Sequence, residues 1–246
     1  MSCRHLLLIL LLAASTAARA ADSSSTQQNK ETAARIAHRQ ELEYQLLERK
    51  IAYGKATLAD VRKGLSITDI GKLTNIVLAL YSMRWQRGVF VLLHNMWDLK
   101  DKNVYPELNW KEFAKPPVRL ALATTLLRVD QFHNQRYVDY LRAHEQDKNE
   151  FHRAQVVVGL GFKGEPRDIH YIYRMAGGKD AYVAEAAITA LGLMALPQAK
   201  DGLLLLHKKY ANDPRDMVIM NVLQKAYKWE PGQDKADSGH GARPRP

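Results

Sequence analysis

Apolar residues recur every three or four positions along most of the chain, which is the spacing that places them on one face of an α-helix. The first such stretch covers residues 30–53, where Ile36, Leu42 and Ile51 alternate with charged residues. Gly54 follows at the place where glycine commonly ends a helix. The pattern predicts an amphipathic helix, which either packs on the rest of the chain or pairs with a helix of a partner.

The N-terminal helix and a linker together occupy residues 30–64. Two further helices are expected after them. Thr68 and Asp69 both offer an N-cap for a helix over residues 70–83. Their side chains can accept hydrogen bonds from the N–H groups that a first helical turn leaves unpaired. A second helix is expected over residues 86–99, so the two stretches together predict a helical pair.

Residues 100–115 interrupt this helical pattern. The stretch is charged and contains Tyr105, Pro106 and Trp110. It predicts an insertion loop with room for one short helix. We expect the two aromatic side chains to be exposed there and to offer a contact for a partner.

The most informative feature is a sequence repeat with a fixed offset of 31 residues. The pairs Leu160-Gly161 and Leu191-Gly192 are separated by this offset, and so are Pro166 and Pro197 in the turns that follow. The same offset relates Leu120 to Phe151 and Tyr182, and Thr125 to Val156 and Ala187. Each unit predicts a helix, a short turn and a second helix. Such a unit cannot cover its own apolar face, so the copies are expected to stack.

One copy of this repeat resembles a unit of the HEAT-like helical repeats in their short form of about 31 residues. The matching residues are Val183, Ala186, Ala187, Ala190, Leu191, Gly192, Pro197 and Ala199. The resemblance covers residues 65–229 and is strongest over 150–212. It implies an all-α fold, an α-solenoid of HEAT-like helical hairpins that follows the N-terminal amphipathic helix. These repeats mostly serve as binding scaffolds, so the resemblance implies no particular reaction.

The two ends of the chain depart from the repeat. A basic start, nine apolar residues and a run of small residues predict a secretory signal peptide over 1–20, cleaved near Ala20. Residues 21–29 predict a flexible leader and residues 230–246 a disordered tail. The single cysteine, Cys3, falls within the signal peptide. We therefore expect a periplasmic or secreted mature protein that has no disulfide.

The composition is that of a globular protein with a basic surface. Apolar residues make up 46% and charged residues 25%, which excludes a wholly disordered chain and a polytopic membrane protein. The 36 Lys and Arg outnumber the 26 Asp and Glu, a net charge of +10, and this charge favours anionic partners. The basic residues are dispersed, so nucleic acid is not an expected partner. No transmembrane segment is expected in the mature chain.

Residues 159–164 read G-x-G-x-x-G after three valines, as in dinucleotide-binding loops, and Asp180 follows about twenty residues later. The repeat offers a different explanation. Gly161 shares its repeat position with Gly192 and is interpreted as a helix-end residue, and Gly164 as part of the turn between helices. We therefore expect no bound cofactor.

Candidate metal ligands form a second pattern. Asp139, His170 and Asp201 share one repeat position, 31 residues apart. Because neighbouring helices pack about 8–10 Å apart, side chains at equivalent positions could converge. This leaves a metal-dependent enzyme as one alternative, although no common hydrolase or phosphate-binding motif occurs in the sequence.

The interpretation we favour is an exported, non-catalytic scaffold or adaptor that binds a protein partner in the bacterial envelope. Binding is expected on the concave face of the second helices, because tyrosine and arginine are the residues that most often anchor protein interfaces. The expected contact residues are Arg136, Tyr140, Arg167, His170 and Tyr171. The alternatives are charge-driven binding of an anionic envelope polymer and the metal-dependent enzyme.

Overall fold

The computed structural model describes residues 30–129 and 135–230, and within these ranges the chain is helical with no β-strand. The all-α fold class expected from the sequence is thus confirmed. The chain divides into two units at residue 49, and each is described by itself. The expected signal peptide (1–20) and leader (21–29), and the tail from residue 231, lie outside the described residues.

The first unit contains one helical stretch, residues 30–49, which confirms the expected N-terminal helix. Its apolar residues Ile36, Leu42 and Leu46 are each more than half exposed. Arg39 and Glu43 form an exposed ion pair along the same helix, with 3.1 Å between Nε and Oε1. The stretch is therefore helical as the sequence indicates, and these apolar and charged side chains are both exposed.

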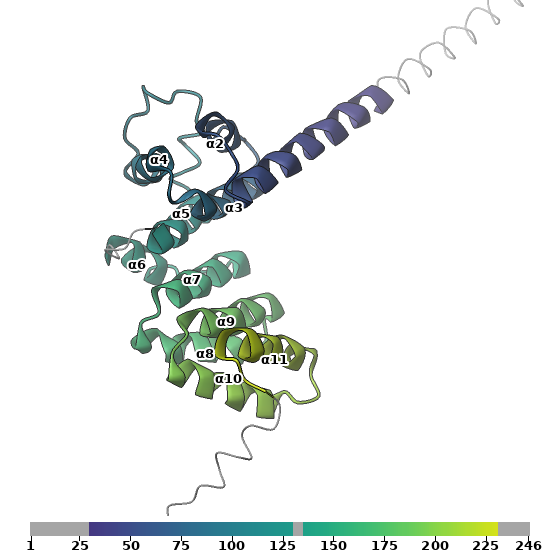
Figure 1. The fold of residues 1–246 in the computed structure, drawn as a ribbon, viewed down its shortest axis with the longest axis vertical. Coiled ribbons are helices and arrows are strands. Elements are labelled where there is room, and N and C mark those ends of the chain that lie inside the picture. Colours follow the sequence, from purple (N-terminus) through teal and green to yellow (C-terminus); the bar gives the residue numbers. More distant parts are fainter. Residues whose placement is uncertain (1–29, 130–134, 231–246) are drawn as a thin grey trace, which may run out of the picture. The chain divides into compact units, whose positions relative to one another are not determined.

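The second unit contains the remaining helices (Figure 1). They are α2 (Leu58–Leu65), α3 (Ile70–Ala79), η1 (Leu80–Met83), α4 (Arg87–Asp98), α5 (Pro116–Val129), α6 (Gln135–Arg142), α7 (Glu150–Lys163), η2 (Pro166–Asp168), α8 (Ile169–Ala176), α9 (Ala181–Met194), α10 (Pro197–Lys209) and α11 (Pro214–Tyr227). Asp69 caps α3 by accepting a hydrogen bond from the Lys72 N–H.

The helices follow the repeat. Helices α5, α7 and α9 are the first helices of three successive units, and α6, α8 and α10 are the second helices. Within this unit α3 packs on α5, α5 on α7, α7 on α9 and α9 on α11. Helix α8 contacts both α9 and α10. Thr125, Val156 and Ala187, which share one repeat position, are all completely buried. This repeat position is therefore a core position of the first helices, whereas at the position shared by Leu120, Phe151 and Tyr182 the two aromatic side chains are at least half exposed.

Glycines at equivalent repeat positions allow the first helices to approach closely. A Cβ on Gly161 would lie 2.8 Å from the Cα of Ala190 on α9, and one on Gly192 would lie 2.4 Å from a methyl of Val222 on α11. Both glycines lie inside helices, so their interpretation as helix-end residues is wrong. Gly164, with φ +69°, is the residue that ends α7.

The three valines before Gly159 belong to helix α7, not to a strand. A dinucleotide fingerprint needs a strand that feeds its glycines under the pyrophosphate. The local structure of this segment is therefore that of a helix and the turn that follows it.

Two short segments differ from expectation. The linker before residue 64 contains α2, which begins with a capping box in which Thr57 and Asp60 each bond the other's backbone N–H. The 100–115 loop contains no helix and is anchored by buried Leu108 and Phe113. Trp110, expected to be exposed, is partly buried and donates its Nε1–H to the Tyr105 carbonyl at 2.7 Å.

No helix in the described part of the chain is both long and apolar enough to cross a membrane.

Candidate partner-binding groove

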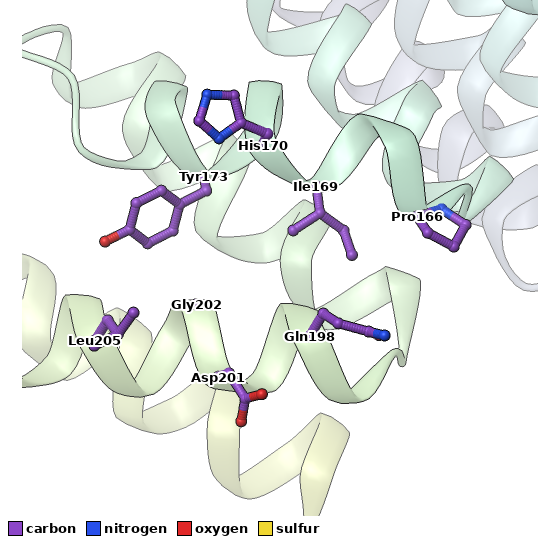
Figure 2. A pocket seen from close by; sticks show the side chains of 8 residues that line it. All are labelled: Pro166, Ile169, His170, Tyr173, Gln198, Asp201, Gly202 and Leu205. Carbon is purple, nitrogen blue, oxygen red and sulfur yellow. The ribbon is translucent and has the colours of Figure 1, made fainter.

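A groove with a volume of about 400 Å³ lies between the second helices α8 and α10. Its lining residues are Pro166, Ile169, His170, Tyr173, Gln198, Asp201, Gly202 and Leu205 (Figure 2). The 31-residue repeat explains its position. Proline-containing turns begin both second helices, at Pro166 and Pro197, and α8 and α10 then pack as neighbours.

The interior of the groove is largely apolar. Figure 2 shows Ile169 and Tyr173 projecting from α8 toward α10. Gly202 on α10 permits the close approach of the two helices, because a Cβ there would lie 3.2 Å from the Cδ2 atom of Tyr173. Leu205, one turn further along α10, is 57% exposed. An exposed leucine beside an open apolar groove is available to an apolar side chain of a partner.

Two lysines follow the lining residues along α10. Lys208 and Lys209 are exposed, whereas Arg174 on α8 lies over the ring of Tyr171, 5.9 Å from its centre. The Lys209 Nζ reaches the C-terminal end of α8, 3.9 Å from the position a Cβ on Gly177 would occupy. Asp201 is the acidic residue among those that line the groove. The two lysines favour acidic groups on whatever molecule enters the groove.

The start of α8 is fixed by a partly buried ion-pair network. Arg142 at the end of α6 donates from Nη2 to Asp168 at 2.8 Å and to Glu165 at 3.0 Å. Burial alone would raise the pKa of Glu165, but hydrogen bonds from Arg167 and Arg142 outweigh it and hold the pKa below its usual value. The network thereby connects two successive second helices and positions the groove wall.

Two of the five expected contact residues lie at this groove. His170 is exposed and belongs to its lining. Arg167 is exposed beside Pro166 and donates from Nε to Glu165 at 2.6 Å. Both side chains are accessible to a partner, although part of the charge of Arg167 is already neutralised.

Tyr171 was expected on the binding face but lies in the core. Its side chain is 8% exposed, and its hydroxyl donates to the backbone carbonyl of Glu145 at 3.2 Å. Burial, together with the Glu145 carboxylate, raises the pKa of the Tyr171 hydroxyl to about 12. The expected surface role is therefore corrected: Tyr171 holds α8 against the preceding loop, and Tyr173 is the tyrosine that faces the groove.

The remaining two contact residues, Arg136 and Tyr140, lie on α6 around the buried Trp97. The Tyr140 ring meets the Trp97 ring edge-on, with 5.5 Å between centroids, and burial raises the pKa of its hydroxyl. Arg136 pairs with Asp98 at 2.6 Å. Arg119 lies over the other side of this cluster, 4.1 Å from the Trp97 ring centre. These side chains contact one another through ring contacts and an ion pair, and they do not line the α8–α10 groove.

The structure gives the metal alternative no geometric support. Asp139 accepts a hydrogen bond from Gln135 one turn away, at 2.8 Å. Figure 2 shows His170 and Asp201 projecting away from each other on α8 and α10. Within the described ranges, no group of three or more His, Cys, Asp or Glu side chains is arranged to hold a metal ion.

Sequence reasoning missed Tyr173, Gly202 and Leu205 as groove residues. A signal for them was present, because Ile169 and Tyr173 are one turn apart on α8, and Gly202 and Leu205 are nearly one turn apart on α10. These residues are apolar positions on the second helices in addition to the positions that the 31-residue repeat assigns to the core.

Comparisons with known protein families and with curated proteins give no match for this chain.

Proposed function

We propose that this protein is an exported, non-catalytic scaffold that binds a protein partner in the bacterial envelope. In this proposal the helical pairs form a HEAT-like α-solenoid. Binding takes place on the face formed by the second helices, at the groove between α8 and α10. The single observation that carries the proposal is this open, apolar groove of about 400 Å³, built from two equivalent helices of neighbouring repeat units.

The sequential packing of the first helices supports the solenoid. Each of α5, α7 and α9 contacts the next first helix along the chain, as expected when repeats stack in one direction. The equivalent glycines Gly161 and Gly192 lie at successive helix crossings. A stack of this kind leaves its second helices available as a continuous surface for binding.

The partner we propose is a protein segment that carries an apolar side chain followed by acidic residues. The apolar side chain would enter between Ile169 and Tyr173, and the acidic residues would meet Lys209, whose ammonium group lies near the C-terminal end of α8. Apolar burial supplies most of the affinity of such a contact. The charges favour the correct orientation and a faster encounter.

Matched charge substitutions test the groove. Leu205→Asp places a carboxylate in the apolar groove, and Met217→Asp places one at another exposed apolar position, on α11 and outside the groove. Leu205 is 57% exposed and Met217 is 72% exposed, so neither change should unfold the protein. The assay is capture of a partner from an envelope extract, with a photo-crosslinker at position 205 to identify the protein bound there.

We expect the Met217→Asp protein to retain the crosslink-identified partner and the Leu205→Asp protein to lose it. Equal capture by both variants would refute binding at the groove. The extract is also run at low and high salt, because retention that both variants lose equally on adding salt would favour the anionic-polymer alternative instead.

A further inference from the structure

Five side chains form an arginine–aromatic stack at the C-terminal ends of three first helices. The stack consists of Tyr81 on η1, Arg84 and Trp85 just after it, Arg128 in the last turn of α5 and Phe162 in the last turn of α7. Because α3, α5 and α7 pack side by side, their C-terminal ends bring these residues together. The stack is on different helices from the α8–α10 groove.

Arg128 lies between two rings. Its guanidinium carbon is 3.4 Å from the centre of the Tyr81 ring and 4.0 Å from that of Phe162. Arg84 also stacks on Tyr81, at 4.4 Å, and on Trp85, at 4.7 Å. The outermost ring, that of Trp85, is 78% exposed. The stack therefore runs from a half-buried guanidinium to an open aromatic face.

Both guanidinium groups stack on the Tyr81 ring, and neither has a carboxylate partner among the described residues. Arg84 also donates from Nη1 to the Tyr81 carbonyl at 3.4 Å. The Nε of Arg128 is buried and has no hydrogen-bond acceptor in the described part of the chain. Burial lowers the pKa of Arg128, and the positive charge of Arg84 adds to that effect, yet an arginine remains charged at neutral pH. Aromatic faces attract these cations but do not neutralise them.

The ligand chemistry follows from these features. Two adjacent positive charges are compensated best by a dianion, and guanidinium groups match the oxygens of phosphate with paired hydrogen bonds. The exposed face of Trp85 favours a flat apolar group next to the anion. We propose that the arginine–aromatic stack binds the phosphate of a monoester, with Arg84 and Arg128 on the phosphate oxygens and Trp85 against the organic group.

The test uses phenyl phosphate as the probe and the full chain at pH 7.5 and low salt, with affinity measured by calorimetry. Each of Arg84→Gln and Arg128→Gln removes one charged donor, so we expect each to weaken binding roughly tenfold. Arg35→Gln is the matched control, because Arg35 is exposed on the N-terminal helix and the substitution lowers the net charge equally. Circular dichroism verifies that each variant remains folded.

Two further probes separate the phosphate from general charge and stacking. Phenylacetate carries the same ring and a single charge, and should bind at least tenfold more weakly than phenyl phosphate. A fluorescence change on binding should disappear in Trp85→Phe, because Trp97 and Trp229 are buried and Trp110 is held in the 100–115 loop by its hydrogen bond to Tyr105. The proposal is overturned by an Arg84→Gln protein that binds normally, by an equal loss in Arg35→Gln, by equal affinity for phenylacetate, or by no saturable binding.

Discussion

Gly161→Ala is the substitution that tests the packing of the repeat most directly. Gly161 lies inside α7, where alanine is the better helix former. Judged from local structure alone, the change should stabilise the protein. Judged from the tertiary structure it should destabilise it, because the added Cβ would lie 2.8 Å from the Cα and Cβ of Ala190 and 2.9 Å from its carbonyl oxygen.

The magnitude follows from these distances. Carbon atoms pack at about 3.5–4.0 Å, so α7 and α9 would have to separate by about 1 Å, and the contacted atoms include backbone that cannot rotate away. Overpacking of this kind costs about 1–3 kcal/mol, and contact with backbone places this substitution in the upper half of that range. The higher helix propensity of alanine stabilises the variant by about 1 kcal/mol. We therefore expect Gly161→Ala to lower the free energy of unfolding by about 1–2 kcal/mol.

The assay is urea unfolding followed by circular dichroism, in which this loss lowers the midpoint by about 0.5–1 M. Gly88→Ala on α4 is the matched control, because its Cβ would lie 3.4 Å from a Leu58 methyl, an ordinary contact. That variant should be as stable as the wild type or slightly more stable. If Gly161→Ala behaves like Gly88→Ala, the close crossing of α7 and α9 is wrong.

Three further substitutions test local features by urea unfolding. Thr57→Ala removes the capping box of α2 and should cost about 1 kcal/mol, and an unchanged midpoint would contradict the cap. Tyr171→Phe removes the hydroxyl that donates to Glu145 and should cost about 1 kcal/mol at pH 7. Because the folded-state pKa of that hydroxyl is raised to about 12, the wild type should also lose stability as the pH rises from 10 to 12, and the variant should lose less. Glu165→Gln should be most destabilising near pH 7. Since the pKa of Glu165 is lowered in the folded protein, the difference from wild type should shrink as the pH falls below about 4.5, and a constant difference would refute the ion-pair network.

The helices and their caps could be read from local sequence. Apolar periodicity and capping residues act within a few positions, so the N-terminal helix, the cap at Asp69 and the hairpins of the repeat were all predictable. Helix α2 was missed although Leu58, Val61 and Leu65 follow the helical period, because eight residues span only about two turns. The insertion loop was found, but its buried Phe113 could not be recognised without knowing what packs on it.

The candidate groove was predictable only in part. The repeat correctly placed His170 and Asp201 on equivalent positions of second helices, and both line the groove. It could not establish where each side chain points. Tyr171 and Tyr173 are two residues apart and so differ by about 200° around the axis of α8. Which of the two faces the core depends on how α8 is rotated against α9 and α10, and the structure buries Tyr171.

By itself, the sequence determined that this protein is helical, that its helices come in pairs 31 residues apart, and that Thr125, Val156 and Ala187 share one repeat position. These properties depend on interactions between near neighbours and on a period that repeats. The tertiary structure alone decided that Gly161 serves a helix crossing and that Tyr81, Arg128 and Phe162 stack. Those contacts join residues from separate helices, so they are set by the angle and rotation at which the helices pack.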